Sequence, residues 1–325
     1  MKLVTFLRDG QERIGAVLAD GRIADLQQAD PCLAVDMLTL IRRQDELMPL
    51  ARAAAAGPGS AVLDPAGLTL LAPLPRPVAL RDGYAFRQHV ATARRNRGLE
   101  MIAEFDHFPV TYFSNHQAVI GPGPVLVQAH HLRHLDYELE VAAVTGRALC
   151  NCSLEEADAA IFGFMIMNDW SARALQSEEM KLSLGPCKGK DFATSLGPWL
   201  VTCDELALAD SPQGRVLEAR MSCAVNGRLL SEGEAASMNW TFAQILQRSA
   251  YGVRVSPGEV FGSGTVGTGC LLELNGSGRT DDLWLHPGDV VSMAVAGLGR
   301  LENQVVQGPA VDLPFSLVAL GPRSS

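Results

Sequence analysis

Two glutamates stand two residues apart in an apolar stretch, LDYELEVAAVTG, at residues 135–146. The stretch alternates like a β-strand, in which side chains at i and i+2 point to the same face. Glu138 and Glu140 would therefore lie side by side. The opposite face would hold Leu139, Val141, Ala143 and Thr145. Neighbouring carboxylates in a buried setting repel one another and resist desolvation, so a positive partner is expected, and a metal ion is the simplest candidate.

A third carboxylate, Asp169, closely follows the longest apolar run, AAIFGFMIM at residues 159–167. A carboxylate at the end of a buried strand can project into a cleft. With Glu138 and Glu140 it would form an all-oxygen site of the kind that Mg²⁺, Ca²⁺ or Mn²⁺ prefers. The spacing alone fits a solvated acidic edge equally well, so both interpretations stay open at this point.

His89 lies in the most basic stretch of the chain, FRQHVATARRNRG. Most histidines on helices are ordinary surface or core residues. The arginines around His89 suggest instead a positive rim that attracts a carboxylated substrate and carries a general base. These arginines are Arg87, Arg94, Arg95 and Arg97. The alternative interpretation is a solvated helix face.

Other motifs of known chemistry fail in their context. GSGTVG at residues 262–267 matches the dinucleotide fingerprint, but TGCLLELN after it has the pattern of another strand. GPCKGK lacks the spacing of a phosphate-binding loop, and neither G-x-S-x-G nor H-E-x-x-H occurs. The seven cysteines have no zinc-ligand spacing and indicate reduced thiols in a cytoplasmic protein.

The composition is that of an ordinary soluble protein. The 325 residues carry a net charge of −9, which argues against nucleic acid and anionic membranes as partners. The longest apolar run is about half a membrane span, and the N-terminus has too short an apolar run for a signal peptide. A small anionic substrate is still compatible, because a site can be locally positive.

The pattern of elements predicts an α+β fold rich in strands, in two domains. Residues 1–75 form a small α/β domain with a hairpin turning at Asp9-Gly10 and a helix after it. The proline-spaced segment APLPRPVAL leads into the second domain, residues 76–325. That domain begins with a helix from about Tyr84, followed by a pair formed by the strand GPVLVQ and the acidic strand. Ser153 and Glu156 predict a capping box at the next helix.

Five segments in this order give the chain a family resemblance: DYELE, NDWSARALQ, GPCKGKDFATSLGPW, GSGTVG and PGDVV. Together they resemble the fumarylacetoacetate hydrolase family over roughly residues 76–325. Residues 1–72 look like the small N-terminal domain of some bacterial members. The resemblance implies a mixed β-roll catalytic domain and a homodimer.

The resemblance also implies roles for particular residues. A divalent metal ion would be held by Asp82, Glu138, Glu140 and Asp169. His89 would be the catalytic base, oriented by Glu273 in an apolar strand. The other catalytic residues, which would stabilise the developing oxyanion, are Arg173, Gln176 and Lys190. Substrate contacts would come from Tyr112, Met180, Thr194 and Thr265. Met180 replaces a tyrosine of the eukaryotic enzymes, and an arginine expected after the histidine helix has no clear match, with Arg97 only nearby.

The activity that the resemblance implies is hydrolysis of a C–C bond in a β-diketone. Candidate substrates are fumarylacetoacetate, fumarylpyruvate or a related acylpyruvate, as small anionic diketo acids in aromatic compound catabolism, including that of aromatic amino acids. A second possibility is a decarboxylase, hydratase or isomerase with the same metal site. A third is a metal-stabilised binding protein without catalysis. Product analysis distinguishes the first two, and ligand binding without turnover would indicate the third.

Overall fold

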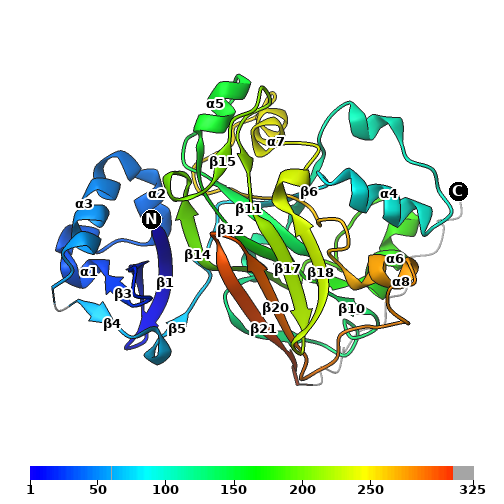
Figure 1. Cartoon of the computed structure of the whole chain (residues 1–325), viewed down its shortest axis with the longest axis horizontal. Helices are drawn as coiled ribbons and strands as arrows, with labels where there is room; N and C mark the ends of the chain where they lie inside the picture. The colour runs from blue at the N-terminus through cyan, green and yellow to red at the C-terminus, as the bar shows by residue number, and fades with distance from the viewer. Residues whose placement is uncertain (60, 310–325) are drawn as a thin grey trace, which may run out of the picture.

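The computed structural model describes residues 1–59 and 61–309, and the last part of the predicted second domain lies outside the described residues (Figure 1). Its framework is a 12-stranded mixed sheet. The strands of this sheet are β1 (Lys2–Arg8), β2 (Gln11–Val17), β3 (Ile23–Asp25), β4 (Val62–Leu63), β5 (Thr69–Leu70), β6 (Leu80–Gly83), β7 (Thr111–Ser114), β8 (Val119–Ile120), β11 (Leu139–Thr145), β12 (Ile161–Asp169), β14 (Thr194–Thr202) and β19 (Val260–Gly262). The main path runs β4-β3-β2-β1-β14-β12-β11-β19-β6-β7.

A second, five-stranded sheet has the order β18-β17-β20-β21-β9. Its strands are β9 (Gly123–Val127), β17 (Arg220–Val225), β18 (Arg228–Glu234), β20 (Val290–Val295) and β21 (Gly299–Gln307). Two short pairs complete the strands, β10 (Leu135–Asp136) with β13 (Ser171–Ala172), and β15 (Leu208–Ala209) with β16 (Val216–Leu217). The helices are α1 (Leu26–Ala29), α2 (Met37–Arg42), α3 (Gln44–Ala56), α4 (Arg87–Arg95), α5 (Leu154–Ala159), α6 (Arg173–Glu179), α7 (Phe242–Ser249) and α8 (Leu271–Gly276). This β-rich α+β architecture agrees with the predicted fold class.

The N-terminal hairpin is confirmed. Asp9 and Gly10 both have positive φ, 52° and 73°, which is the backbone twist that a two-residue hairpin turn requires. The predicted single helix after it is instead two, α2 and α3, which meet at Arg43. Strand β1 pairs with β14, so the sheet runs from the N-terminal region into the rest of the chain. The domain boundary at residue 75 stays a prediction.

The acidic strand β11 lies in the middle of the large sheet, between β12 and β19. Both of its faces are buried, because Val141 belongs to the hydrophobic cluster between the sheets and Val144 to the cluster shared with the N-terminal region. The predicted pairing of GPVLVQ with this strand is wrong. That segment is β9, which pairs with β21 of the second sheet, because residues 128–134 carry the chain from one sheet to the other.

Several predicted boundaries hold. The capping box of Ser153 and Glu156 opens α5, and the apolar strand β12 ends at Asp169. The helix expected from Tyr84 begins at Arg87 as α4. Within the described residues, no helix is long and apolar enough to cross a membrane.

Candidate active site

Four buried carboxylates lie close together on the large sheet: Asp82, Glu138, Glu140 and Asp169. One oxygen from each lies within 4.8 Å of the others. Glu138 is 6% exposed and Glu140 is fully buried, so the interpretation as a solvated acidic edge is wrong. β6, β11 and β12 contribute three of them, and Glu138 immediately precedes β11. β12 and β11 are adjacent and β19 lies between β11 and β6, so one sheet brings together residues that lie far apart in the sequence.

The glycine-rich segment at residues 262–267 gives the cluster its shape. A side chain at Gly262 would collide with Oδ1 of Asp82 and with Met167. Gly264, at φ 76°, donates its backbone N–H to the same oxygen, at 3.1 Å. The expectation of a strand after this segment is wrong, since α8 begins at Leu271. The glycines make room for a carboxylate and orient it.

Two cationic side chains neutralise one side of the cluster. Lys190 Nζ lies 2.5 Å from Glu138 and 2.7 Å from Asp169. Arg173 donates to Glu138, at 2.8 Å, and to the amide oxygen of Gln176, at 3.0 Å. In the part of the chain that is described, Asp82 and Glu140 have no ion pair with a basic side chain.

The electrostatics of the cluster differ on its two sides. Burial, reinforced by the charge of Asp169, raises the pKa of Asp82 to about 7. Burial and the neighbouring carboxylates raise the pKa of Glu140 well above its ordinary value. Burial opposes ionisation of Glu138 too, but Lys190, Arg173 and His89 outweigh it and lower its pKa to about 2. The side formed by Asp82 and Glu140 is therefore short of positive charge.

Unpaired oxygens identify a place for a cation. Oε2 of Glu140 and Oδ1 of Asp169 are buried and have no hydrogen-bond partner among the described residues. Buried polar atoms normally have partners, and carboxylate oxygens are the ligands of Mg²⁺, Ca²⁺ and Mn²⁺. The residues present thus fit a divalent ion.

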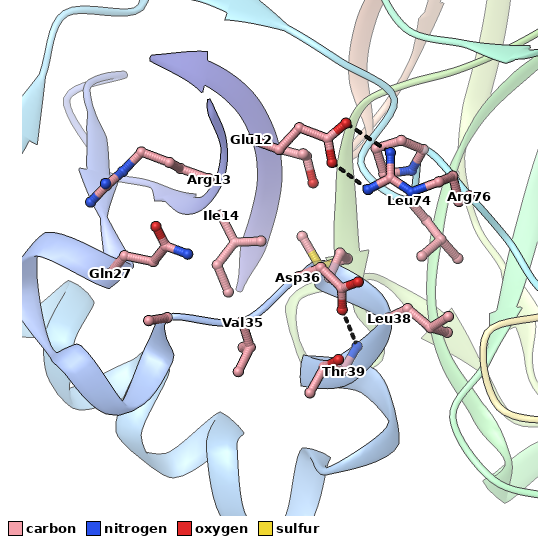
Figure 2. A pocket seen from close by; sticks show the side chains of 14 residues that line it. Glu12, Arg13, Ile14, Gln27, Val35, Asp36, Leu38, Thr39, Leu74 and Arg76 are labelled. Carbon is pink, nitrogen blue, oxygen red and sulfur yellow. Dashed lines mark hydrogen bonds and ion pairs between the residues drawn. The ribbon is translucent and has the colours of Figure 1, made fainter. Parts of the chain in front are cut away.

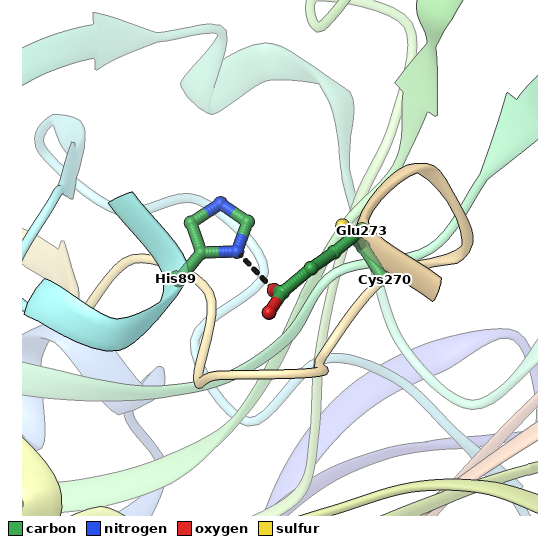
Figure 3. Close-up of side chains that lie close together, drawn as sticks. All are labelled: His89, Cys270 and Glu273. Carbon is green, nitrogen blue, oxygen red and sulfur yellow. Dashed lines mark hydrogen bonds and ion pairs between the residues drawn. The ribbon is translucent and has the colours of Figure 1, made fainter. Parts of the chain in front are cut away.

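His89 and Glu273 form a buried pair (Figure 3). His89 is close enough to the cluster to help lower the pKa of Glu138. Nδ1 of His89, on α4, lies 2.7 Å from Oε2 of Glu273, and both residues are buried. Glu273 lies on α8, so its predicted position in a strand is wrong. In a segment as short as CLLELN, the apolar residues fit the period of a strand or that of a helix. Leu271 and Leu274 are both buried and lie three residues apart, which is the spacing of a helix. A carboxylate only accepts hydrogen bonds, so the Nδ1 proton points at Glu273 and Nε2 is left as an acceptor.

The predicted substrate contacts fall into two groups. Tyr112, on β7, donates its hydroxyl to Asp169 at 2.5 Å, and Thr265 lies 3.4 Å from Glu140. Thr194, on β14, has a buried hydroxyl without a hydrogen-bond partner among the described residues. Met180 follows α6 and is 44% exposed. Thr194 lies opposite Asp169 in the pairing of β14 with β12, so three of the four lie at the carboxylates. Met180 lies beyond the end of α6.

Sequence reasoning missed two neighbours of the site. Tyr84 packs edge-on against His89, with ring centroids 6.1 Å apart. Asp136 is fully buried and pairs with Arg173. The second could have been found, because Asp136, Glu138 and Glu140 repeat an acid at every second position.

A cavity of about 520 Å³ lies away from this site, between the N-terminal region and the connector to the rest of the chain (Figure 2). Glu12 and Arg76 pair across it, and the Asp36 carboxylate accepts the backbone N–H of Thr39. None of the four clustered carboxylates lines it. Arg13 pairs with Asp25, outside the cavity lining. Among the residues that the structure describes, this cavity thus holds no group of carboxylates like the cluster at the large sheet.

Comparison with known proteins agrees with this geometry. Residues 79–306 match the family model described as "Fumarylacetoacetate (FAA) hydrolase C-terminal", and the chain belongs to the fumarylacetoacetate hydrolase family. It is 27% identical over 311 residues to the oxaloacetate tautomerase YisK of Bacillus subtilis, covering 90% of this chain and 95% of the relative. It is 28% identical over 309 residues to the 2,4-didehydro-3-deoxy-L-rhamnonate hydrolase of Sphingomonas sp. (strain SKA58), covering 94% and 96%.

The fold is also that of maleylpyruvate hydrolase from Sphingobium sp. SYK-6, whose structure was solved with manganese(II) and pyruvate. The TM-score is 0.70 at 23% identity, covering 95% of this chain and all of the other. The family is enzymatic and includes hydrolases, isomerases and tautomerases.

Proposed function

We propose that this protein is a metal-dependent hydrolase that cleaves a C–C bond of a small β-diketo acid, such as an acylpyruvate. The observation that carries the proposal is the buried pair of His89 and Glu273 beside four carboxylates. A base held in one tautomer by a carboxylate is what activation of water needs. The hydrolases among the relatives, with the manganese and pyruvate bound to one of them, support the proposal.

Each side chain has a distinct task in this proposal. A divalent ion in the cluster would act as a Lewis acid and orient two adjacent oxygens of the substrate. Nε2 of His89 accepts a proton from water as the water oxygen bonds to the carbonyl carbon, and Glu273 stabilises the imidazolium that results. Lys190 and Gln176 would donate hydrogen bonds to the developing oxyanion, whose stabilisation is worth about 100- to 1000-fold in rate.

The second half of the reaction uses the proton that His89 took from water. The bond between the attacked carbon and its neighbour breaks, and its electron pair stays on the fragment that carries the 2-oxo acid. His89 returns the proton to that carbon, so one acid and one 2-oxo acid leave, and the base is restored. Atoms balance, because water supplies the hydroxyl of the first product and the hydrogen of the second.

A tautomerase or isomerase is the second candidate, favoured by the match to oxaloacetate tautomerase over 90% of the chain. In that reaction His89 would take a proton from carbon and return it to oxygen, or the reverse, without consuming water. The His89–Glu273 pair could serve either reaction, so the reaction products distinguish the hydrolase from the tautomerase.

The deciding experiment incubates the purified full chain with fumarylacetoacetate, fumarylpyruvate, maleylpyruvate, short acylpyruvates and oxaloacetate, with Mn²⁺ or with EDTA. Loss of the diketone absorbance is followed by spectrophotometry, and the products are identified by mass spectrometry. Mn²⁺-dependent formation of two acids supports the hydrolase. A spectral change at constant mass supports the tautomerase. No change with any substrate, while Mn²⁺ still binds, would overturn both and favour a binding protein.

A further inference from the structure

Asp136 is a buried carboxylate at the junction of the two halves of the site. It lies on β10 and has no exposed surface. Its Oδ1 accepts the backbone N–H of Leu271, at 2.7 Å, and of Tyr137, at 2.9 Å. Its Oδ2 accepts the backbone N–H of Leu272, at 3.0 Å, and Nε of Arg173, at 2.8 Å. Both oxygens are thus fully engaged by groups from three different segments.

One branch of these contacts leads to the carboxylate cluster. The Arg173 guanidinium is held by Asp136 on one side and donates to Oε1 of Glu138 on the other. Two carboxylates on one buried guanidinium fix its plane, because its donors form a rigid fork. Without Asp136, Arg173 would keep Glu138 and Gln176 as partners but would lose the acceptor at Nε that completes the orientation of its plane. Glu138 would then lose a fixed partner.

The other branch leads to the histidine pair. The N–H groups of Leu271 and Leu272 are the first of α8 and have no partner within the helix. Asp136 supplies that partner for both, which sets where α8 begins and how it is oriented. Glu273 is the next residue, and its carboxylate holds Nδ1 of His89.

We propose that Asp136 is a positioning residue that ties the metal-binding carboxylates and the His89–Glu273 pair into one geometry. This role rests on the proposed function, because the two groups that Asp136 connects are the proposed metal ligands and the proposed base. Asp136 touches neither the reacting atoms nor the ion. It acts through Arg173 on one side and through the start of α8 on the other. Residues that orient metal ligands in this way typically contribute 10- to 100-fold to metal affinity.

The test compares Asp136→Asn with Asp25→Asn in the full chain. Asp25 is a matched control, since it is also fully buried, accepts a helix N–H (Gln28) and pairs with an arginine (Arg13). It lies at the end of β3 in the N-terminal region, away from the carboxylate cluster (Figure 1). Mn²⁺ affinity is measured by calorimetry. The ¹⁵N signals of His89 are measured by NMR on metal-free protein and assigned with His89→Gln.

D136N is expected to weaken Mn²⁺ binding about 10-fold or more and to shift both His89 nitrogen signals. D25N is expected to change neither the Mn²⁺ affinity nor the His89 signals, even if its melting temperature falls as far as that of D136N. Wild-type Mn²⁺ affinity and His89 signals in D136N would overturn the inference. Equal losses in D25N would do so too, because the effect would then be general destabilisation.

Should D136N fail to fold, Asp136→Glu keeps the charge and moves the carboxylate by one methylene. It is expected to fold and still bind Mn²⁺ less tightly, and wild-type values for both readouts would overturn the inference. Neither readout needs turnover. A wild-type protein that cleaves no diketone would therefore disprove the proposed hydrolase, while the role of Asp136 would still be decided by affinity and NMR.

Discussion

Oε2 of Glu273 lies 2.7 Å from Nδ1 of His89, although the two residues are 184 positions apart in the chain. Glu273→Gln replaces the charge that stabilises a protonated imidazole and allows the wrong tautomer. We expect kcat to fall by about 100-fold or more, with Mn²⁺ affinity within about twofold of wild type. Steady-state kinetics and calorimetry measure the two. Glu302→Gln, at an exposed position on β21, is the control. A wild-type kcat in E273Q would remove the pair from the mechanism.

Much of the site could be predicted because its chemistry is encoded in short spacings. Glu138 and Glu140 at i and i+2, and Asp169 at the end of an apolar strand, depend only on strand geometry. Asp82 and Glu273 were reached through the family resemblance. Strand alternation does not predict that Asp82 lies beside Glu140. The two are close because β6 and β11 both pair with β19.

The errors have a common physical source. CLLELN is a short apolar run that fits either period, and the first N–H groups of its helix bind Asp136, far away in the sequence. GPVLVQ pairs with β21, near the other end of the chain, because long-range pairing and not local pattern decides strand neighbours. The spacing of Asp136 from Glu138 marks it as a residue of interest, but its contacts with Arg173 and α8 are visible only in the structure.

Gly262 is predicted to be required for the shape of the carboxylate cluster. An added Cβ would collide with Oδ1 of Asp82 and with Met167, so Gly262→Ala forces the carboxylate to move. A displacement of about 1 Å in a functional site can cost about 100-fold in activity, and we expect Mn²⁺ affinity to fall at least tenfold. Gly67→Ala is the matched control, because its Cβ would meet open space. Unchanged Mn²⁺ affinity in G262A would contradict the geometry described for Asp82.

Glu140 is predicted to destabilise the metal-free protein and to be needed for stabilisation by metal. Its carboxylate is buried among other acids, which raises its pKa well above the ordinary value, and it has no ion pair among the described residues. Folding therefore costs free energy, either to bury the charge or to take up a proton, and Glu140→Gln removes that cost. We expect the free energy of unfolding of the metal-free protein to rise by about 1 kcal/mol or more. Mn²⁺ at about 100 times its Kd should stabilise the wild type by about 2.7 kcal/mol, and E140Q much less.

Urea unfolding with and without Mn²⁺ measures both parts of the prediction for Glu140. Exposed Glu302→Gln again serves as the control for loss of a glutamate. If E140Q is less stable than wild type without metal and is stabilised by Mn²⁺ to the same degree, Glu140 is not a metal ligand.

Met180 is predicted to influence substrate choice without affecting the chemistry. It lies one helical turn beyond Gln176 and two beyond Arg173, on the same side of α6 and its continuation. A tyrosine there would offer a hydroxyl donor to the distal end of a longer substrate. We expect Met180→Tyr to raise kcat/KM for fumarylacetoacetate relative to a short acylpyruvate by about tenfold. Leu182→Tyr, at a more exposed position nearby, is the control. An unchanged ratio in M180Y would place the distal end of the substrate elsewhere.

His131 is predicted to make the fold sensitive to acid. Its ring stacks on Phe192, and its Nδ1 accepts the backbone N–H of Gln128 at 3.1 Å. Burial, aided by the nearby charges of His130 and Lys188, lowers its pKa from 6.5 to about 4. A pKa lowered on folding gives stability that is complete above pH 6.5 and is lost as the pH falls toward 4. His131→Phe keeps the stacked ring but removes the titrating group.

We therefore expect H131F to be less stable than wild type at pH 7, because the Gln128 N–H loses its acceptor. Between pH 6.5 and pH 4, however, the free energy of unfolding should fall less steeply in H131F than in the wild type. Urea unfolding at several pH values measures the two slopes in parallel. Equal slopes would mean that His131 takes up its proton as readily in the folded chain as in the unfolded one. The hydrogen bond from Gln128 to a neutral ring would then not describe the protein in solution.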